Sequence, residues 1–259
     1  MKSTALITGS SRGRGAEFAR LFASKKTNLI LVARSEKELN VLKNELESEY
    51  EISVSTIVKD LTKPENVQAV YDEIKALGIE VDYLVNNAGF GDFADFSDTE
   101  WEIHEQMINL NISALSHFCH LFVQDWIPRK SGKILNIAST SAFQPGPGMS
   151  VYFASKAYVV SFSQAIDYEF RKYGITVTAL CPGPVKTNFG IAARMKHPNG
   201  ILKDMKTPSP KEVVEFGYNA MMKGKSLVIH GMLNKLVANS VRFMPRKWLV
   251  NLSAKLISW

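Results

Sequence analysis

The sequence predicts an α/β fold in which helices cover both faces of a doubly wound parallel sheet of about seven strands, giving three layers. Two observations lead to this prediction. Short continuous apolar runs alternate with amphipathic helical patterns along the 259 residues, as expected of buried parallel strands joined by helical crossovers. A glycine-rich turn also lies directly between the first apolar run and the first helical pattern, an arrangement typical of phosphate-binding units.

The individual elements follow one another in strict alternation over most of the chain. We expect strands at residues 5–8, 28–33, 53–58, 83–86, 134–138, 176–180 and 227–229. We expect helices at residues 16–25, 36–49, 65–77, 100–126, 152–173 and 211–222. Right-handed crossovers between such strands produce a doubly wound sheet, and its ligands bind outside the carboxyl ends of the strands.

Length and composition agree with a single domain over residues 1–259. Hydrophobic residues make up 46% and charged residues 22% of the chain, which are ordinary globular values. The first strand begins close to the N-terminus and no apolar run reaches roughly 18 residues, so we expect no signal peptide, no membrane span and a cytoplasmic location. The two cysteines, Cys119 and Cys181, are expected as reduced core residues. Because His117 and His120 lack a third ligand at metal spacing, we expect no metal site.

A tyrosine and a lysine four residues apart are the strongest chemical signal. Tyr152 and Lys156 share one face of a predicted helix, and Ser139 ends the strand before it. Lowering a tyrosine pKa from near 10 to about 7 needs roughly 4 kcal/mol, which a positive charge at ~4 Å supplies at an effective dielectric constant of about 20. The pair can therefore form an acid or base that works near neutral pH, although a lone Tyr-x-x-x-Lys is usually structural.

Several further motifs stand in register with this trio. They are Thr8-Gly9-x-x-x-Gly13-x-Gly15, Asn86-Asn87-Ala88-Gly89, Asn111 and Pro182-Gly183. In this order and at these spacings, residues 3–190 resemble the short-chain dehydrogenase/reductase family, of the NADP-preferring type. The resemblance implies a Rossmann-type fold and transfer of a hydride between a nicotinamide nucleotide and a carbonyl or alcohol.

The resemblance also implies four catalytic roles. Tyr152 would protonate the carbonyl oxygen in reduction or deprotonate the alcohol in oxidation. Lys156 would lower the tyrosine pKa and hold the nicotinamide ribose. Ser139 would donate a hydrogen bond to the substrate oxygen, and Asn111 would anchor a water of the proton relay. For Asn111 the alternative is a satisfied buried amide with no relay.

The same resemblance implies a cofactor site along the carboxyl ends of the strands. Its residues would be Gly9, Ser11, Arg12, Gly13, Arg14, Gly15, Arg34, Asp60, Leu61, Asn87, Ala88, Gly89, Tyr152, Lys156, Pro182, Gly183, Val185 and Thr187. Arg34, rather than an acidic residue, follows the second strand, and Arg12 would point toward the same region. Two guanidiniums suit the 2′-phosphate of NADP(H), which we predict as the cofactor. Alternatively, both are solvated surface arginines.

Arg14 departs from the family pattern, which usually has an aliphatic residue at this position. A guanidinium there would lie near the pyrophosphate or the nicotinamide pocket. It would then strengthen phosphate binding or meet an acidic substrate, or it would fold out to solvent.

The substrate region is rich in aromatic residues and methionine. We expect a substrate lid at 188–210, between the nicotinamide loop and the next helix. Three phenylalanines follow the Asn-Asn-Ala-Gly turn, and three apolar residues flank the catalytic ones: Phe90, Phe93 and Phe96, and Phe143, Met149 and Phe153. This composition favours an apolar ketone or secondary alcohol, such as a fatty-acyl or ring ketone, but ordinary core packing has the same composition.

Positive charge is concentrated in the last part of the chain. Residues 186–259 contain 13 Lys and Arg against 3 acidic residues, and residues 232–259 contain five basic residues and no acidic one. Pro245 is expected to divide the latter segment into two short amphipathic helices. This segment suits an anionic membrane surface, an acidic partner such as an acyl-carrier protein or a coenzyme A thioester, or packing on the substrate lobe or a subunit interface. We expect no nucleic-acid binding, because no recognition motif is present.

Two classes of function remain open at this stage. The first is an NADP(H)-dependent carbonyl reductase or alcohol dehydrogenase acting on a small-molecule substrate. The second is a nucleotide-binding regulatory or scaffold protein of the same fold without useful turnover. By family analogy, a homodimer or homotetramer would form on the two long helices at 100–126 and 152–173.

Overall fold

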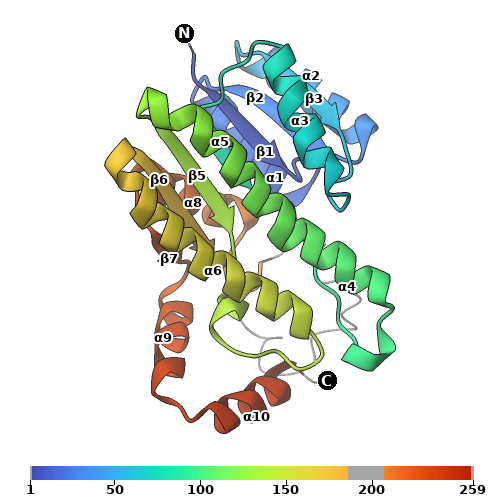
Figure 1. Ribbon diagram of the computed structural model, residues 1–259, viewed down its shortest axis with the longest axis vertical. Helices are drawn as coiled ribbons and strands as arrows, with labels where there is room; N and C mark the ends of the chain where they lie inside the picture. The colour runs from blue at the N-terminus through green and yellow to red at the C-terminus, as the bar shows by residue number, and fades with distance from the viewer. Residues whose placement is uncertain (1, 186–206, 258–259) are drawn as a thin grey trace.

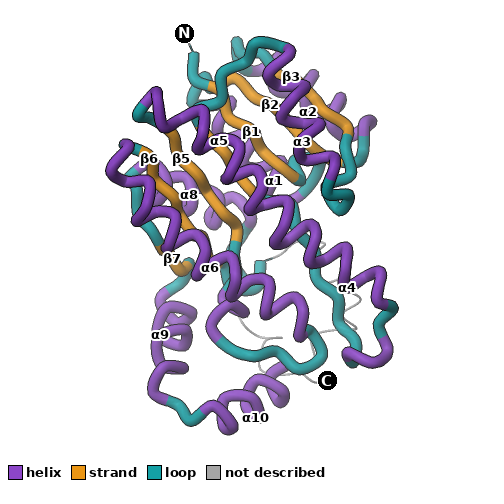
Figure 2. Tube along the Cα trace, viewed as in Figure 1, coloured by secondary structure: helices purple, strands orange, loops and turns teal. Residues whose placement is uncertain are grey.

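The computed structural model describes residues 2–185 and 207–257, and its centre is a seven-stranded parallel sheet (Figures 1 and 2). The strand order is β3-β2-β1-β4-β5-β6-β7, and all six pairings are parallel. The strands are β1 (Thr4–Thr8), β2 (Asn28–Ala33), β3 (Val54–Val58), β4 (Tyr83–Asn86), β5 (Gly132–Ile137), β6 (Ile175–Cys181) and β7 (Leu227–Ile229). This confirms the predicted doubly wound sheet, with strand ends shifted by at most two residues.

The strand order reverses between β1 and β4. The chain proceeds from β1 outward to β2 and β3, then returns to pair β4 on the other side of β1. Helices leave the two strands on opposite faces, so a crevice opens at their carboxyl ends. The fold therefore places the ends of β1, β4, β5 and β6 around one region.

Helices cover both faces of the sheet (Figure 2). They are α1 (Gly13–Ser24), α2 (Glu36–Glu49), α3 (Glu65–Ala76), α4 (Trp101–Ile108), α5 (Leu115–Arg129), α6 (Ser150–Phe170), α8 (Pro210–Met222), α9 (Met232–Ser240) and α10 (Arg246–Ile257). Buried residues of α3, α5 and α6 form one core with the sheet, and those of α1, α2 and α8 form another. The near-continuous burial of β1, β2 and β6 explains why these strands are apolar without alternation.

The predicted helix at 100–126 is not a single α-helix. A π-helical turn at Asn109–Ala114 lies between α4 and α5. Such turns insert an extra residue into the helical repeat and occur often at functional sites. Apolar spacing alone does not distinguish this turn from regular α-helix, so the sequence pattern missed it.

The segment after β7 folds as Pro245 predicts. α9 is followed by a short 3₁₀ turn at Val241–Phe243, and α10 begins directly after the proline. In the part of the chain that the structure describes, no helix combines the length and apolarity needed to cross a bilayer.

Both cysteines lie in the core. Cys119 on α5 and Cys181 at the end of β6 are free and buried. Burial raises the pKa of each thiol to about 12. They are therefore unreactive packing residues, as predicted.

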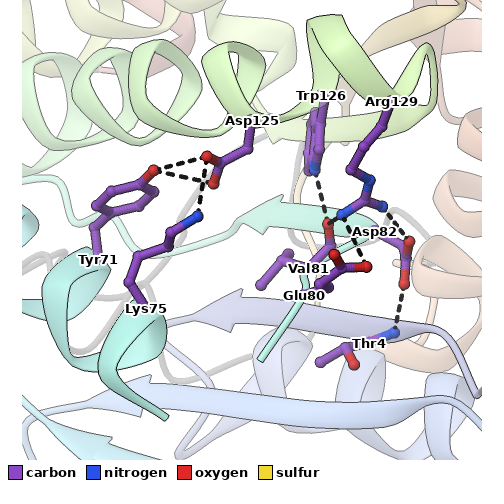
Figure 3. Close-up of polar contacts among 9 residues, drawn as sticks. All are labelled: Thr4, Tyr71, Lys75, Glu80, Val81, Asp82, Asp125, Trp126 and Arg129. Carbon is purple, nitrogen blue, oxygen red and sulfur yellow. Dashed lines mark hydrogen bonds and ion pairs between the residues drawn. The ribbon is translucent and has the colours of Figure 1, made fainter. Parts of the chain in front are cut away.

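Polar contacts fasten α5 to α3 on one face of the sheet (Figure 3). The Tyr71 hydroxyl on α3 lies 3.0 Å from both carboxylate oxygens of Asp125, and Lys75 Nζ lies 3.1 Å from one of them. Burial and the neighbouring carboxylate raise the pKa of Tyr71 to about 12. These three side chains therefore hold α3 and α5 together.

The end of α5 is fastened to the segment before β4 (Figure 3). The Trp126 indole donates to the Val81 carbonyl at 2.7 Å, and Arg129 Nη2 donates to Asp82 Oδ1 at 2.6 Å. The other carboxylate oxygen of Asp82 accepts the Thr4 amide at 2.9 Å, which fixes the start of β1. This cluster sets the position of α5 relative to the sheet.

We predict that Gly132→Ala lowers stability, because Trp126 leaves no room for a side chain at the start of β5. A Cβ at Gly132 would lie 2.2 Å from Trp126 Cδ2, and the ring is fully buried. Overpacking of this kind costs about 1–3 kcal/mol. Urea unfolding of the variant measures the loss, and Ser131→Ala at the exposed neighbouring position is the control. Equal unfolding midpoints for the two variants would contradict the packing argument.

Candidate active site

Four chain segments meet at the carboxyl ends of the strands. They are the glycine turn after β1, the Asn87-Ala88-Gly89 turn after β4, Ser139 after β5 and Pro182 after β6. Ser139 and Pro182 are joined through the backbone, because Thr140 N donates to the Pro182 carbonyl at 2.9 Å. The predicted site residues therefore belong to one region.

The glycine turn brings the start of α1 very close to β1 and β4. A Cβ at Gly15 would lie 2.1 Å from the Gly9 carbonyl oxygen, and one at Gly9 would lie 2.8 Å from Ala88 Cα. Gly9 and Gly13 also have positive φ angles of 64° and 55°, which favour glycine. No side chain could replace hydrogen at Gly9 or Gly15 without moving the backbone.

The same turn fits a pyrophosphate group. A Cβ at Gly13 would meet no atom within 4 Å, so the backbone there faces open space. In the described structure the first turn of α1 carries neither an acidic residue nor a side-chain cap. Its N–H groups and the helix dipole therefore remain directed at an anion, as a dinucleotide cofactor requires.

Thr8 fixes the turn after β4. Its hydroxyl accepts the backbone amides of Asn87 and Ala88 at 3.1 and 3.0 Å. The Asn87 side chain in turn donates to the carbonyls of Thr8 and Gly9, both at 3.1 Å. These reciprocal bonds hold the two predicted cofactor turns together.

The two arginines assigned to a 2′-phosphate lie in different environments. Arg34 directly follows β2 and is exposed. Arg12 is exposed as well, but it forms an ion pair with Glu38 on α2, and its Nε donates to the same carboxylate at 2.8 Å. The sequence interpretation missed Glu38, because nothing in its local pattern indicates a partner 26 residues away. The role of both arginines toward a phosphate remains a prediction.

Asp60 has a structural role at the end of β3. Its carboxylate accepts the backbone amide and hydroxyl of Thr62 at 3.1 and 2.9 Å, and its carbonyl accepts the Asn66 side chain at 2.8 Å. Leu61 beside it is buried. These contacts shape the turn into α3, and the adenine contact of Asp60 and Leu61 stays a prediction.

Tyr152 lies in the first turn of α6 within a small apolar cluster. Its buried neighbours there are Met107, Met149 and Phe153, and the tyrosine itself is only 8% exposed. Burial raises the pKa of the Tyr152 phenol, whereas the positive charge of Arg14 and hydrogen bonding by Ser139 lower it. The phenol is therefore a buried proton donor whose acidity depends on nearby polar groups.

Ser139 is arranged to donate its hydroxyl proton. Its Oγ accepts the Ser141 backbone amide at 3.1 Å. Its proton is then available to the Tyr152 oxygen or to a substrate oxygen beside it. Ser139 and Tyr152 can therefore both donate to one substrate oxygen.

Lys156 is buried on the same helix. Its Nζ donates to the Ile137 carbonyl at 2.9 Å and lies 5.7 Å from the centroid of the Tyr152 ring. Burial, assisted by the charge of Arg14, lowers the pKa of Lys156 to about 7. A substantial neutral fraction is thus present near neutral pH.

Arg14 is a further source of positive charge near Tyr152, and the sequence did not indicate this effect. Its charge lowers the pKa of the phenol. Lys156 was expected to lower the same pKa, and that role stays a prediction, because burial lowers the pKa of the lysine itself to about 7. Arg14 is half-buried and so does not fold out to solvent. Its substitution for the family's aliphatic residue therefore has an electrostatic effect at the site.

Asn111 connects three segments of the site. Its side chain donates to the Phe90 carbonyl at 2.9 Å and to Ser155 Oγ at 3.1 Å, and it accepts the Phe90 amide at 3.1 Å. A Cβ at Gly89 would lie 2.9 Å from Asn111 Oδ1 and 3.4 Å from Lys156 Nζ. The π-turn thus holds the loop after β4 against the helix that carries Tyr152 and Lys156.

Ser155 was not among the predicted site residues. It is fully buried, and its hydroxyl donates to the Tyr152 carbonyl at 2.7 Å while accepting from Asn111. A serine between Tyr152 and Lys156 on a helix has no sequence signal of its own. Only its position opposite the π-turn shows that it supports the site.

The aromatic residues predicted near the substrate separate into groups. Phe90, Phe93 and Phe153 pack around Tyr152, whereas Phe143 packs against the main core. Phe96 is 60% exposed, stacks on His104 and is not part of that cluster. Fewer of the predicted apolar residues therefore surround Tyr152 than the sequence suggested.

The segment after β6 is described only in part. Pro182 is buried, and a Cβ at Gly183 would lie 2.4 Å from the Asn234 side chain of α9. Val185 is half-buried and packs against the core beneath α1, α2 and α8. Thr187 and most of the predicted lid at 188–210 lie outside the described residues.

The fold and this arrangement of residues define a class of dinucleotide-dependent oxidoreductases. The family model for short chain dehydrogenases matches residues 3–197. The chain therefore belongs to the short-chain dehydrogenase/reductase family.

Known relatives match between 80% and 96% of this chain. The human very-long-chain 3-oxoacyl-CoA reductase is 27% identical over 259 residues, which span 96% of this chain and 79% of that protein. The human inactive hydroxysteroid dehydrogenase-like protein 1 is 33% identical over 218 residues, 80% of this chain and 62% of that protein. A short-chain dehydrogenase from Sphingobium yanoikuyae, solved in complex with NADPH, is 29% identical with a TM-score of 0.83, covering 93% of this chain and 94% of its own.

Proposed function

We propose that the protein is an NADP(H)-dependent oxidoreductase that interconverts an apolar ketone and its secondary alcohol. The observation that carries the proposal is that three side chains converge beside the glycine turn. Ser139 follows the carboxyl end of β5, and Tyr152 and Lys156 lie in the first two turns of α6. A buried phenol and a hydroxyl donor side by side suit a carbonyl oxygen that gains negative charge.

NADP(H), when bound, supplies or accepts the hydride. Tyr152 would give its proton to the carbonyl oxygen in reduction and remove the alcohol proton in oxidation. Ser139 would donate a second hydrogen bond to the same oxygen and so favour the transition state. Lys156 would hold the nicotinamide ribose hydroxyls, and Asn111 keeps the loop and helix around Lys156 in place.

An extended apolar substrate is supported by two observations. Tyr152 lies among Met107, Met149 and Phe153, so the acid group faces an apolar environment. One relative is by name a very-long-chain 3-oxoacyl-CoA reductase, and such a substrate has a ketone on a long alkyl chain. We therefore propose 3-oxoacyl thioesters and bulky ring ketones as the first substrate classes to test.

The direct test is NADPH oxidation, followed by absorbance, over 3-oxoacyl thioesters, ring ketones and short aldehydes. We expect turnover with the first two classes and little with the third. Tyr152→Phe must abolish the signal. Turnover that persists in this variant would refute the proposed mechanism, and preference for short aldehydes would refute the substrate class.

A second candidate is a nucleotide-binding protein of the same fold without turnover. The name of one relative, an inactive hydroxysteroid dehydrogenase-like protein, favours keeping this candidate. Nucleotide binding alone does not require Asn111, Ser139, Tyr152 and Lys156 together. Tight NADPH binding without turnover across the full panel would support this candidate instead.

The cofactor proposal predicts the effect of removing both arginines. We expect Arg12→Ala/Arg34→Ala to weaken NADPH binding by roughly tenfold or more, because each charge-assisted bond to a phosphate is worth about 1.5–3 kcal/mol. NADH has no 2′-phosphate, so its affinity is expected to change by less than about threefold. Titrations that follow cofactor fluorescence measure both affinities. Equal losses for the two cofactors would contradict the phosphate assignment.

Glu38→Gln provides the matched comparison for this pair. The variant removes the carboxylate that engages Arg12 and leaves both guanidiniums in place. We expect tighter NADPH binding, because Arg12 no longer has to break an ion pair with a carboxylate before it binds the phosphate. An unchanged NADPH affinity would place Arg12 outside the phosphate site.

The charge of Arg14 predicts a change in the pH dependence of oxidation. Oxidation of an alcohol needs ionised Tyr152, and the positive charge of Arg14 lowers the pKa of this phenol. Removing that charge in Arg14→Met raises the pKa, so the activity should rise only at a higher pH than in the unmodified chain. The measurement is kcat for oxidation against pH, with Lys25→Met at the exposed end of α1 as control. If Arg14→Met and Lys25→Met gave the same dependence of kcat on pH, the charge of Arg14 would not be what lowers the pKa of Tyr152.

A further inference from the structure

The two helices after β7 form an extended helical arm, defined here as residues 232–257. It consists of α9, the 3₁₀ turn at Val241–Phe243 and α10, and it lies beyond the carboxyl ends of the strands (Figure 1). Among its described side chains, Ala238, Leu249 and Ser253 are buried. Most of the remaining arm faces solvent.

Large apolar side chains are concentrated on this exposed surface. Phe243 is 89% exposed, Met232 82% and Trp248 69%. The full set is Met232, Leu233, Leu236, Val237, Phe243, Trp248, Val250 and Leu252. Several of them are four residues apart along α9 and α10, so they share helix faces that are largely exposed. An exposed apolar surface of this size is typical of a docking site.

The charge of the arm has a single sign. Its five charged residues are all basic, and all five are exposed: Lys235, Arg242, Arg246, Lys247 and Lys255. Helices with exposed apolar faces, tryptophan and flanking Lys and Arg are suited to the boundary between lipid headgroups and acyl chains. An anionic surface complements both features at once.

The arm is attached next to the candidate active site. The Asn234 side chain of α9 donates to the His230 carbonyl at 2.8 Å and lies against Gly183, which follows β6. α9 also contacts the 3₁₀ turn at Thr140–Phe143, directly after Ser139. These contacts place α9 at the same end of the molecule as the cofactor turns.

We propose that the helical arm docks on the surface of an anionic lipid bilayer. Its exposed apolar residues enter the interfacial region, and its basic residues bind the headgroups. A second copy of the chain fits less well, because a two-fold interface would bring two sets of five positive charges together. An acidic protein would match the charge but would leave eight exposed apolar residues unexplained. The docking does not depend on whether the proposed reductase activity is correct.

The test is co-sedimentation of the full chain with vesicles of phosphatidylcholine alone or of equal parts phosphatidylcholine and phosphatidylglycerol. We expect binding to the anionic vesicles that weakens as salt is raised, and little binding to the neutral ones. Leu236→Ser/Phe243→Ser/Trp248→Ser should reduce binding at least tenfold. Arg246→Gln/Lys247→Gln should reduce it by roughly fivefold for each charge removed.

Tyr168→Ser on α6 is the matched control, because this side chain is 85% exposed and lies in the half of its helix remote from Tyr152. It should bind anionic vesicles like the unmodified chain. The proposal is overturned if the unmodified chain does not bind anionic vesicles, or if both arm variants retain full binding. It is equally overturned if the arm variants lower the mass in sedimentation velocity without any vesicle binding, since the arm would then join copies of the chain.

Discussion

Replacing Tyr152 with phenylalanine is expected to lower turnover by roughly three orders of magnitude and to leave NADPH affinity within about threefold. General acid–base catalysis contributes about 10²–10⁴ in rate. Without the phenol beside it, the Ser139 hydroxyl also stabilises the substrate oxygen less well, which adds to the loss of turnover. The phenylalanine ring preserves the packing with Met107, Met149 and Phe153, so the fold should persist. The change therefore removes one proton donor and little else.

Tyr158→Phe on the same helix is the matched control for this experiment. Its hydroxyl lies 3.0 Å from the Ser116 hydroxyl at a partly exposed position, outside the apolar cluster. Removing it should leave turnover unchanged. Steady-state kcat measurements on both variants, with NADPH titration, separate the chemical step from binding. A Tyr152→Phe enzyme that keeps even a tenth of the activity would show that another group donates the proton.

The sheet could be predicted from sequence because its strands are buried on both faces. Continuous apolar runs such as β1 and β2 have few alternative interpretations when helical patterns separate them. The π-turn at Asn109–Ala114 could not be predicted, because its residues have ordinary helical character. Within it, Asn111 contacts Phe90 and Ser155, which are 21 and 44 residues away and so give no local sequence signal.

The residues of the candidate site could be predicted, but not all of their electrostatics. The motifs identified Tyr152, Lys156, Ser139 and the glycine turns, and the structure brings these together. The spacing of Tyr152 and Lys156 suggested that the lysine supplies the charge, but it did not indicate that burial lowers the pKa of this lysine or that the charge of Arg14 lowers the pKa of Tyr152. Protonation depends on burial in three dimensions, and helical spacing alone does not report it.

Lys156→Met is expected to stabilise the free protein while it impairs function. The pKa of Lys156 is about 7 in the folded chain and near 10.4 in an unfolded one, so the unfolded state binds more protons between these values. Stability should therefore rise with pH from about 7 to 10 in the unmodified chain, and this slope should disappear in the variant. The gain near pH 7 is of the order of a few kcal/mol, since each pKa unit is worth about 1.36 kcal/mol.

Function should change in the opposite direction. The variant lacks the amine that would hold the nicotinamide ribose, so we expect NADPH affinity to fall by roughly tenfold and turnover to be lost. The free protein would thus retain a buried, partly neutral lysine at a cost to its stability because the reaction requires it. Urea unfolding at pH 7 and 9, together with NADPH titration, measures both effects, with Lys37→Met at an exposed position as control. The variant could instead be less stable than the unmodified chain and still gain stability as the pH rises. Lys156 would then be charged when buried, and the positive charge that lowers the pKa of Tyr152 would have to be reassigned.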